Sequence, residues 1–433
     1  MRVRSFLWRT AGHRAGRLAP VPVLAYHEAV TRSLVRALAG DRDVIAIYAH
    51  GSYATGDLRP GRSDVDLVAV VADHDIDGEL DLLARLRVPY RRHQAVLPVD
   101  LAVIPRSAFP DAALALARRR GRIGTPAPMT PLAHWRLLAG AELRGAAPTA
   151  ARGDWYVTEA HVARAVRAAA TGGDVRGALR DLIHDVEREQ LDWPSARRLL
   201  AARDPAQLIA AALALIDAQR ELVPVAASVR DVDGWVAPAV PAIAGLERLA
   251  PPGSATLHRP PFSARPELIV EGEPEPVARW AVDAGARAAH AAGVDLRIAT
   301  RRLAEEGWRG GFRAASIMLA SVPIAGTPLA GRLRLPGDTV LRELGETQAH
   351  GLLADARATM LGRRSMRPDP LLPVRLAAWR VLAGGGPLIG EERALRSVVP
   401  ALGEPDWARR ALAAGRYVSS TPPAAIRAGS MAR

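Results

Sequence analysis

Two aspartates that stand two residues apart, Asp64 and Asp66, come just before the apolar run 67–71. In a strand, residues i and i+2 point to the same face, so these carboxylates would lie roughly 6–7 Å apart at one sheet edge. At an effective dielectric constant of about 20, two negative charges at that separation repel by roughly 2–3 kcal/mol. A divalent cation would turn this repulsion into attraction, and ligands that offer only oxygen suit magnesium. The pattern therefore predicts a magnesium site.

The residues ahead of this pair could hold a phosphate. Gly51 and Ser52 follow the apolar, β-rich run 44–49, and glycine lets the backbone turn tightly after a strand. The serine hydroxyl and the backbone N–H groups of the turn form a ready anion site. Arg59 and Arg62 in the following loop could reach phosphate oxygens, although solvated loop arginines are an equally good interpretation. These four residues are the predicted nucleotide-binding residues.

A third carboxylate, Asp100, lies within the apolar segment LPVDLAV. If that segment is a strand beside Asp64 and Asp66, three carboxylates meet at one end of a sheet. Two-metal phosphoryl chemistry uses such an arrangement: one pair holds the nucleotide metal, and the third acid binds a second metal or accepts the proton of the nucleophile. Asp64, Asp66 and Asp100 are therefore the predicted catalytic and metal-ligating residues.

Periodicity predicts the elements that position these side chains. A helix at 26–38 ends before Gly40, a typical C-terminal cap. Strands are predicted at 44–49, 66–71 and 95–104, with a helix at 77–86. Pro98 inside the third strand indicates an edge or a bulge. This order indicates a compact α/β (α+β) unit with a small mixed sheet that ends near Gly145.

The rest of the chain is predicted to be mostly α-helical, because Ala, Leu and Arg recur at helical spacing. Prolines are frequent between 223 and 276, where long helices cannot run. The predicted division is a basic extension (1–22), the catalytic unit (23–148), a helical domain (150–222), a proline-rich linker or junction (223–276), a C-terminal helical domain (277–418) and a tail (419–433). Segments 168–182 and 377–395 resemble each other faintly, which in so Ala- and Gly-rich a chain is expected by chance.

Composition sets outer limits. With 49% hydrophobic and 24% charged residues the chain reads as globular, and its longest apolar run is too short to span a bilayer. The absence of cysteine excludes disulfides and thiolate zinc sites, and it fits a cytoplasmic location. The net charge of +13 favours polyanions and nucleotides, but all 58 basic residues are arginine, which points to codon bias. The arginine cluster at 118–122 suits a solvated helix end.

The run GSYATGDLRPGRSDVDLVAVV, followed by Asp100, resembles the signature of the DNA polymerase β-type nucleotidyltransferase superfamily. Within that superfamily it is most similar to bacterial aminoglycoside nucleotidyltransferases of the streptomycin/spectinomycin 3''-adenylyltransferase group. The resemblance implies that Ser52 contacts the nucleotide triphosphate, that Asp64 and Asp66 bind magnesium, and that Asp100 is the third carboxylate. It covers 44–145 well, and a weaker similarity covers 374–415.

This chain departs from that group at several positions. The group usually has a lysine after a C-terminal glycine turn, where this chain has Glu391 and Glu392. Its third acid is often glutamate, which is one methylene longer than Asp100. Residues 150–370 have no counterpart in the resemblance, so it leaves the acceptor open.

The predicted function is transfer of a nucleoside monophosphate, with AMP from ATP favoured, to a hydroxyl of a small aminoglycoside-like molecule. Pyrophosphate would be released, and two Mg²⁺ ions are expected. The alternatives are an acceptor that is RNA, a protein side chain or a nucleotide (a second messenger), or a non-catalytic nucleotide-binding scaffold. A dedicated nucleic-acid groove is not favoured, because such grooves interleave aromatic residues with basic ones.

A helix facing the cleft could also supply a base or a stacking ring. The candidate bases are Glu159, His161, His184 and Glu187, for which ion pairs or a solvated face are the simpler interpretation. The candidate rings are Trp155, Tyr156, Trp193, Trp280, Trp379 and Trp407, for which a place in the core is the simpler interpretation.

Overall fold

The fold is that of a computed structural model. It describes residues 20–56, 58, 64–109, 111–113, 132, 135–144, 156–188, 191–221, 235–263, 265–306, 311–333, 338–363, 368–387 and 389–417. The predicted tail and residues 1–19 of the predicted basic extension lie outside these ranges. Within them, no helix is both long and apolar enough to cross a membrane.

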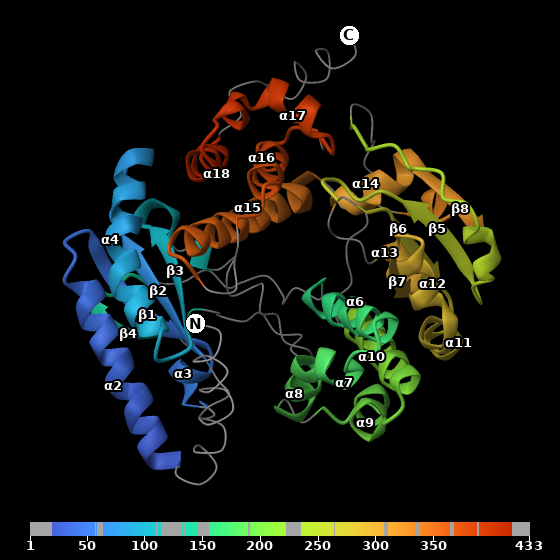
Figure 1. The fold of residues 1–433 in the computed structure, drawn as a ribbon, viewed down its shortest axis with the longest axis horizontal. Helices are drawn as coiled ribbons and strands as arrows, with labels where there is room; N and C mark the ends of the chain where they lie inside the picture. Colours follow the sequence, from blue (N-terminus) through green and yellow to red (C-terminus); the bar gives the residue numbers. More distant parts are fainter. Residues whose placement is uncertain are drawn as a thin grey trace.

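The N-terminal unit is built on a four-stranded sheet in the order β3-β2-β1-β4 (Figure 1). Its strands are β1 (Val44–His50), β2 (Val65–Val71), β3 (Val99–Pro105) and β4 (Arg136–Gly140). β1 pairs antiparallel with β2 and β4, whereas β2 and β3 are parallel. The predicted small mixed sheet is confirmed. β3 is an edge strand and Pro98 stands just before it, so the proline removes no ladder hydrogen bond.

Helices α2 (Pro20–Ala39) and α4 (Ile76–Gln94) supply apolar side chains to one face of this sheet. The other face packs on a cluster that includes Phe109 and Trp135. Every residue of β2 is buried, which explains why its sequence is a continuous apolar run interrupted only by Asp66. α4 is the crossover that a parallel strand pair requires.

Two blocks of helices follow. The first comprises α6 (Tyr156–Ala170), α7 (Val175–Ala178), α8 (Arg180–Arg188), α9 (Pro194–Ala201) and α10 (Pro205–Glu221). The second comprises α15 (Asp338–Met360), α16 (Leu372–Ala383), α17 (Glu392–Val398) and α18 (Trp407–Gly415). The predicted fold class, a small α/β unit followed by a larger helical part, is therefore confirmed.

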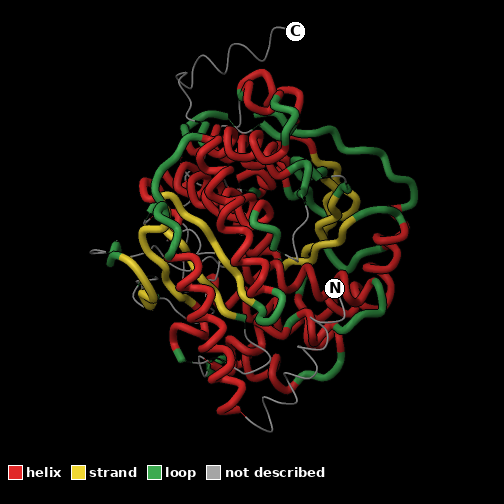
Figure 2. Tube along the Cα trace, turned by 60° about the vertical axis from the view of Figure 1, so that its left-hand side comes forward, coloured by secondary structure: helices red, strands yellow, loops and turns green. Residues whose placement is uncertain are grey.

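Between these blocks the structure differs from the sequence-based interpretation. A second four-stranded sheet contains β5 (Ser254–His258), β6 (Glu267–Glu271), β7 (Asp295–Ala299) and β8 (Ser321–Ala325). The range 223–276 is thus not all linker, and 277–418 is not all helical. The prolines before and after β5 exclude long helices but leave room for five-residue strands. Figure 2 shows the two sheets as separate groups of strands.

Short helices connect the strands of the second sheet. They are α11 (Pro274–Trp280), a π-helical turn (Ala281–Gly285), α12 (Ala286–Ala291), α13 (Arg301–Glu306) and α14 (Gly311–Ala320). Short 3₁₀ turns lie at Arg106–Ala108, Leu246–Leu249, Ala330–Arg332 and Pro400–Gly403.

The C-terminal helices return to the N-terminal unit. α15 packs on β3 and α4, and α18 also contacts α4 (Figure 1). Arg357 of α15 donates from Nε to Glu79 of α4 at 2.6 Å, and both side chains are buried. Burial alone would raise the pKa of Glu79, but Arg357 and Arg416 more than offset it and hold that pKa below its usual value. This buried ion pair fixes α15 beside the sheet edge that carries the aspartates.

Candidate active site

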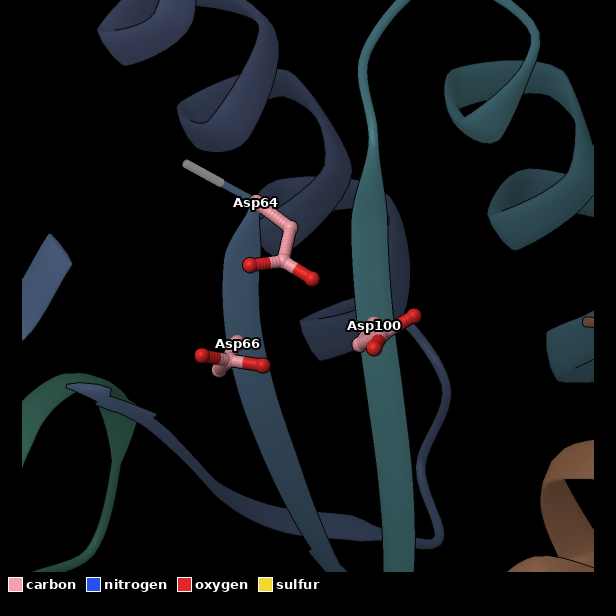
Figure 3. A group of neighbouring side chains, drawn as sticks. All are labelled: Asp64, Asp66 and Asp100. Atoms are coloured by element: carbon pink, nitrogen blue, oxygen red, sulfur yellow. The ribbon is translucent and has the colours of Figure 1, made fainter. Parts of the chain in front are cut away.

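Strand register brings the three predicted acids together (Figure 3). Asp66 on β2 lies directly opposite Asp100 on the parallel strand β3, and Asp64 immediately precedes β2. Each of the three offers a carboxylate oxygen, and these oxygens all lie within 4.8 Å of one another. Asp64 is exposed, Asp100 is half-buried and Asp66 is only 3% exposed. The cluster therefore reaches from the sheet interior to the surface.

The chemistry of this donor set fits a hard divalent cation. Three carboxylates so close together repel one another strongly, and burying an ionised carboxylate as deeply as Asp66 is unfavourable without a compensating charge. Oxygen ligands from several carboxylates, with one side open, match how Mg²⁺ is held beside substrate phosphates. The geometry is compatible with the predicted carboxylate triad.

An arginine from the C-terminal part of the chain also contacts this cluster. Arg363 donates from Nη2 to Oδ2 of Asp100, and each side chain is partly buried. Gly362 has φ of 80° and ends α15, where the N–H of Arg363 bonds the carbonyl of Ala358 at 3.0 Å. This glycine-terminated helix end turns the chain toward β3. Sequence reasoning missed Arg363, because no local pattern links it to an acid 263 positions away.

Two of the predicted nucleotide-binding residues, Gly51 and Ser52, lie at the end of the neighbouring strand. β1 ends at His50, and Gly51, with φ of 67°, begins the short helix α3 (Gly51–Thr55). Glycine is required here because other residues are strained at that φ. His50 pairs with Asp66 across the β1–β2 ladder, so Gly51 and the half-buried Ser52 lie next to the carboxylate row.

Neighbouring side chains fix this turn in place. The His50 ring stacks on Trp135 with 5.2 Å between ring centroids, and the Arg136 guanidinium lies over the Tyr53 ring. Tyr53 donates to Glu28 of α2 at 2.6 Å; burial and this carboxylate raise the pKa of Tyr53 to about 12. No local pattern selects Trp135 or Arg136, because the β1–β4 pairing brings them to this position.

Several candidates lie elsewhere or cannot be placed. Arg59, Arg62, the arginine cluster at 118–122 and Trp155 are outside the described residues, as are the side chains of Tyr156 and Glu159. His161 is on α6, which packs on β7 of the second sheet. His184 and Glu187 are on α8, which packs against α6, α7 and α9.

The described tryptophans among the ring candidates have structural surroundings. Trp280 and Trp407 donate to the carbonyls of Leu249 and Asp369 at 3.0 and 2.9 Å. Trp193 and Trp379 are partly buried against the largest apolar core, as the simpler interpretation predicts.

Comparison with known proteins bears on the same residues. Residues 32–121 match the family model described as a nucleotidyltransferase domain. The matched segment contains Gly51, Ser52 and all three clustered aspartates. No curated protein and no solved structure gives a significant match. The match supports the domain type and does not extend to the aminoglycoside group that the sequence resembles.

Proposed function

We propose that this nucleotidyltransferase transfers a nucleoside monophosphate, AMP from ATP, to a hydroxyl group of a small aminoglycoside-like molecule and releases pyrophosphate. The observation that carries the proposal is the cluster of Asp64, Asp66 and Asp100 within a matched nucleotidyltransferase domain. In the reaction a bond forms between the acceptor oxygen and the α-phosphorus, and the bond from that phosphorus to the pyrophosphate oxygen breaks.

Asp64, Asp66 and Asp100 would hold Mg²⁺, with two ions expected. When bound, the metal neutralises triphosphate charge and lowers the pKa of the acceptor hydroxyl. Asp100, the half-buried member, either completes the second metal site or accepts the proton that the hydroxyl loses. Arg363 already contacts this carboxylate and places a positive charge beside the proposed metal site.

Gly51 and Ser52 are proposed to hold the triphosphate, because their turn opens beside the carboxylate row. Arg59 and Arg62 are proposed to assist from the loop between β1 and β2. The acceptor is proposed to lie on the side of the site that α15 and Arg363 border, since α15 packs on β3. A cytoplasmic location stays a prediction.

The test combines purified full-length protein, Mg²⁺, each nucleoside triphosphate in turn, and a panel of acceptors. The panel contains aminoglycosides, simpler polyols, tRNA and the protein itself. Mass spectrometry should find one small hydroxylated acceptor heavier by one nucleoside monophosphate, with pyrophosphate released. Asp66→Asn should abolish this product, whereas Asp81→Asn, an exposed acid on α4 of the same domain, should not. Modification of tRNA or protein instead would contradict the small-molecule acceptor.

A further inference from the structure

The second sheet repeats the first. Its order β7-β6-β5-β8 corresponds strand for strand to β3-β2-β1-β4. β1 pairs antiparallel with β2 and β4, and β5 pairs antiparallel with β6 and β8. The remaining pairs, β2 with β3 and β6 with β7, are parallel. A helical crossover joins the parallel pair in both cases, α4 in one and α11–α12 in the other (Figure 1).

The polar row across the strands is repeated as well. In the first sheet, register places His50, Asp66 and Asp100 side by side on three neighbouring strands. In the second sheet the row is His258, Glu267 and Asp295. Topology alone can arise independently, but the same histidine–acid–acid row, at the same end of the sheet, indicates a duplicated unit.

The helices that follow each sheet are exchanged between the two units. α6 follows the first sheet and packs on β7 and α12 of the second, whereas α15 follows the second sheet and packs on β3 and α4 of the first. Both helices contain Thr-x-Ala-His, at 158–161 and 347–350. Both are followed by a glycine with positive φ, Gly172 at 68° and Gly362 at 80°.

An arginine on one exchanged helix, and one just after the end of the other, lie near the third acid of the other unit's row. Arg363 contacts Asp100, and Arg167 of α6 lies 3.9 Å from Asp295 through Nη2 and Oδ2. A pocket opens beside this second row and is lined in part by Arg167, His290 and Arg297. The second unit thus has a counterpart of the active-site edge, which includes an arginine that comes from the other unit.

The chemistry of the second row is different. Arg265 stands two positions ahead of Glu267, where the first unit has Asp64 ahead of Asp66. Glu267, 3% exposed, accepts a contact from His258 Nε2 at 3.0 Å and a second from Arg297 of the next strand. Arginine side chains therefore lie where the first unit has carboxylates that could bind a metal. Their positive charge would repel a divalent cation.

The phosphate-binding turn has changed too. His258 is followed by Arg259 and Pro260, where His50 is followed by Gly51 and Ser52. Arg259 stands where Gly51 does and does not adopt the positive φ of that glycine, and Pro260, at the position of Ser52, has neither a hydroxyl nor an N–H to donate to a phosphate. Among its described residues, the second unit therefore lacks both the carboxylate cluster for a metal and the glycine–serine turn for a phosphate.

We propose that residues 254–415 form a second nucleotidyltransferase-type unit that binds no metal–nucleotide and performs no transfer. It serves the active unit by delivering α15 and Arg363 to Asp100, so that one chain forms an internal pair of one active and one inactive unit. This inference rests on the proposed function of the first site.

Equilibrium dialysis of the full-length protein with Mn²⁺ and a non-hydrolysable ATP analogue tests the proposal. Wild type should bind one nucleotide per chain, Asp66→Asn should bind none above background, and Asp295→Asn should still bind one. Glu267→Gln should also bind one, and Asp295→Asn keeps the test valid if that buried substitution impairs folding. Two sites in wild type, or loss of the site in Asp295→Asn, would overturn the inference. Nucleotidyl transfer retained in a folded Asp66→Asn would also overturn it. Failure of the proposed function is distinguishable, since the wild type would then bind no nucleotide and would transfer none to any acceptor of the panel.

Discussion

Arg363 donates a hydrogen bond to Asp100 across 263 positions of sequence. One residue follows the end of a C-terminal helix, and the other lies on the edge strand of the N-terminal sheet. Because Asp100 is also the third member of the carboxylate cluster, the C-terminal helices are connected directly to the proposed metal site. A divalent cation bound by Asp100 would therefore compete with Arg363 for Oδ2 of that carboxylate.

Removing this competitor should strengthen metal binding. Arg363→Gln is expected to raise Mn²⁺ affinity in the absence of nucleotide about fivefold, equivalent to about 1 kcal/mol for a partly exposed ion pair. Titration followed by electron paramagnetic resonance measures this affinity. Arg409→Gln is the matched control, since it removes the same charge from a pair with Asp77 at the same interface. Unchanged or weaker Mn²⁺ binding in Arg363→Gln would contradict the competition.

The buried pair between α15 and α4 should matter for stability. Arg357→Met leaves the Glu79 carboxylate buried with one partner fewer and is expected to lower the free energy of unfolding by about 3 kcal/mol. Urea denaturation measures the change. The double variant Glu79→Gln/Arg357→Met should cost less than the sum of the single changes, because no buried charge is stranded. Additive losses would show that the two side chains are not coupled.

Acid pH should lower the free energy of unfolding, because His350 on α15 is buried in its neutral form. Burial, with the charges of Arg380 and Arg357, lowers the pKa of His350 from 6.5 to about 4. Above pH 6.5 the residue is neutral in both states, whereas between pH 6.5 and about 4 the unfolded chain binds a proton that the folded chain does not. The free energy of unfolding should therefore fall by roughly 3 kcal/mol over that window.

His350→Gln isolates this contribution, because other acids, Glu79 included, also titrate at low pH. Denaturation curves recorded at several values between pH 7 and pH 4 should show a shallower loss of stability in the variant. Parallel curves for wild type and variant would contradict the assignment.

Much of the first unit could be predicted from local sequence. The apolar run 44–49 became β1, which extends one residue further to His50, and the strand at Asp66 became β2, one residue earlier. The i, i+2 spacing of Asp64 and Asp66 predicted a shared sheet end, and the β2–β3 register brought Asp100 to it. These features depend on strand periodicity, which acts over a few residues.

The second unit could not be predicted in this way. β5 to β8 are five residues each, and prolines flank β5 and β6 and interrupt β8, so strand periodicity is not sustained over enough residues to be recognised. The faint similarity between 168–182 and 377–395 compared the end of α6 and the residues after it with α16 and the residues after it, and did not compare α6 with α15. Likewise Arg363 reaches Asp100 only through packing of α15 on β3, which no local pattern encodes.

The central claim is that three aspartates form one metal-dependent transfer site. Its most direct test is the rate of pyrophosphate release by Asp64→Asn, Asp66→Asn and Asp100→Asn, each measured across a range of Mg²⁺ concentrations with the identified acceptor. Each variant should fold as wild type does by circular dichroism and lose at least about a thousandfold in kcat/KM, or about 4 kcal/mol of transition-state stabilisation. A folded variant of any of the three within tenfold of wild type would contradict the account.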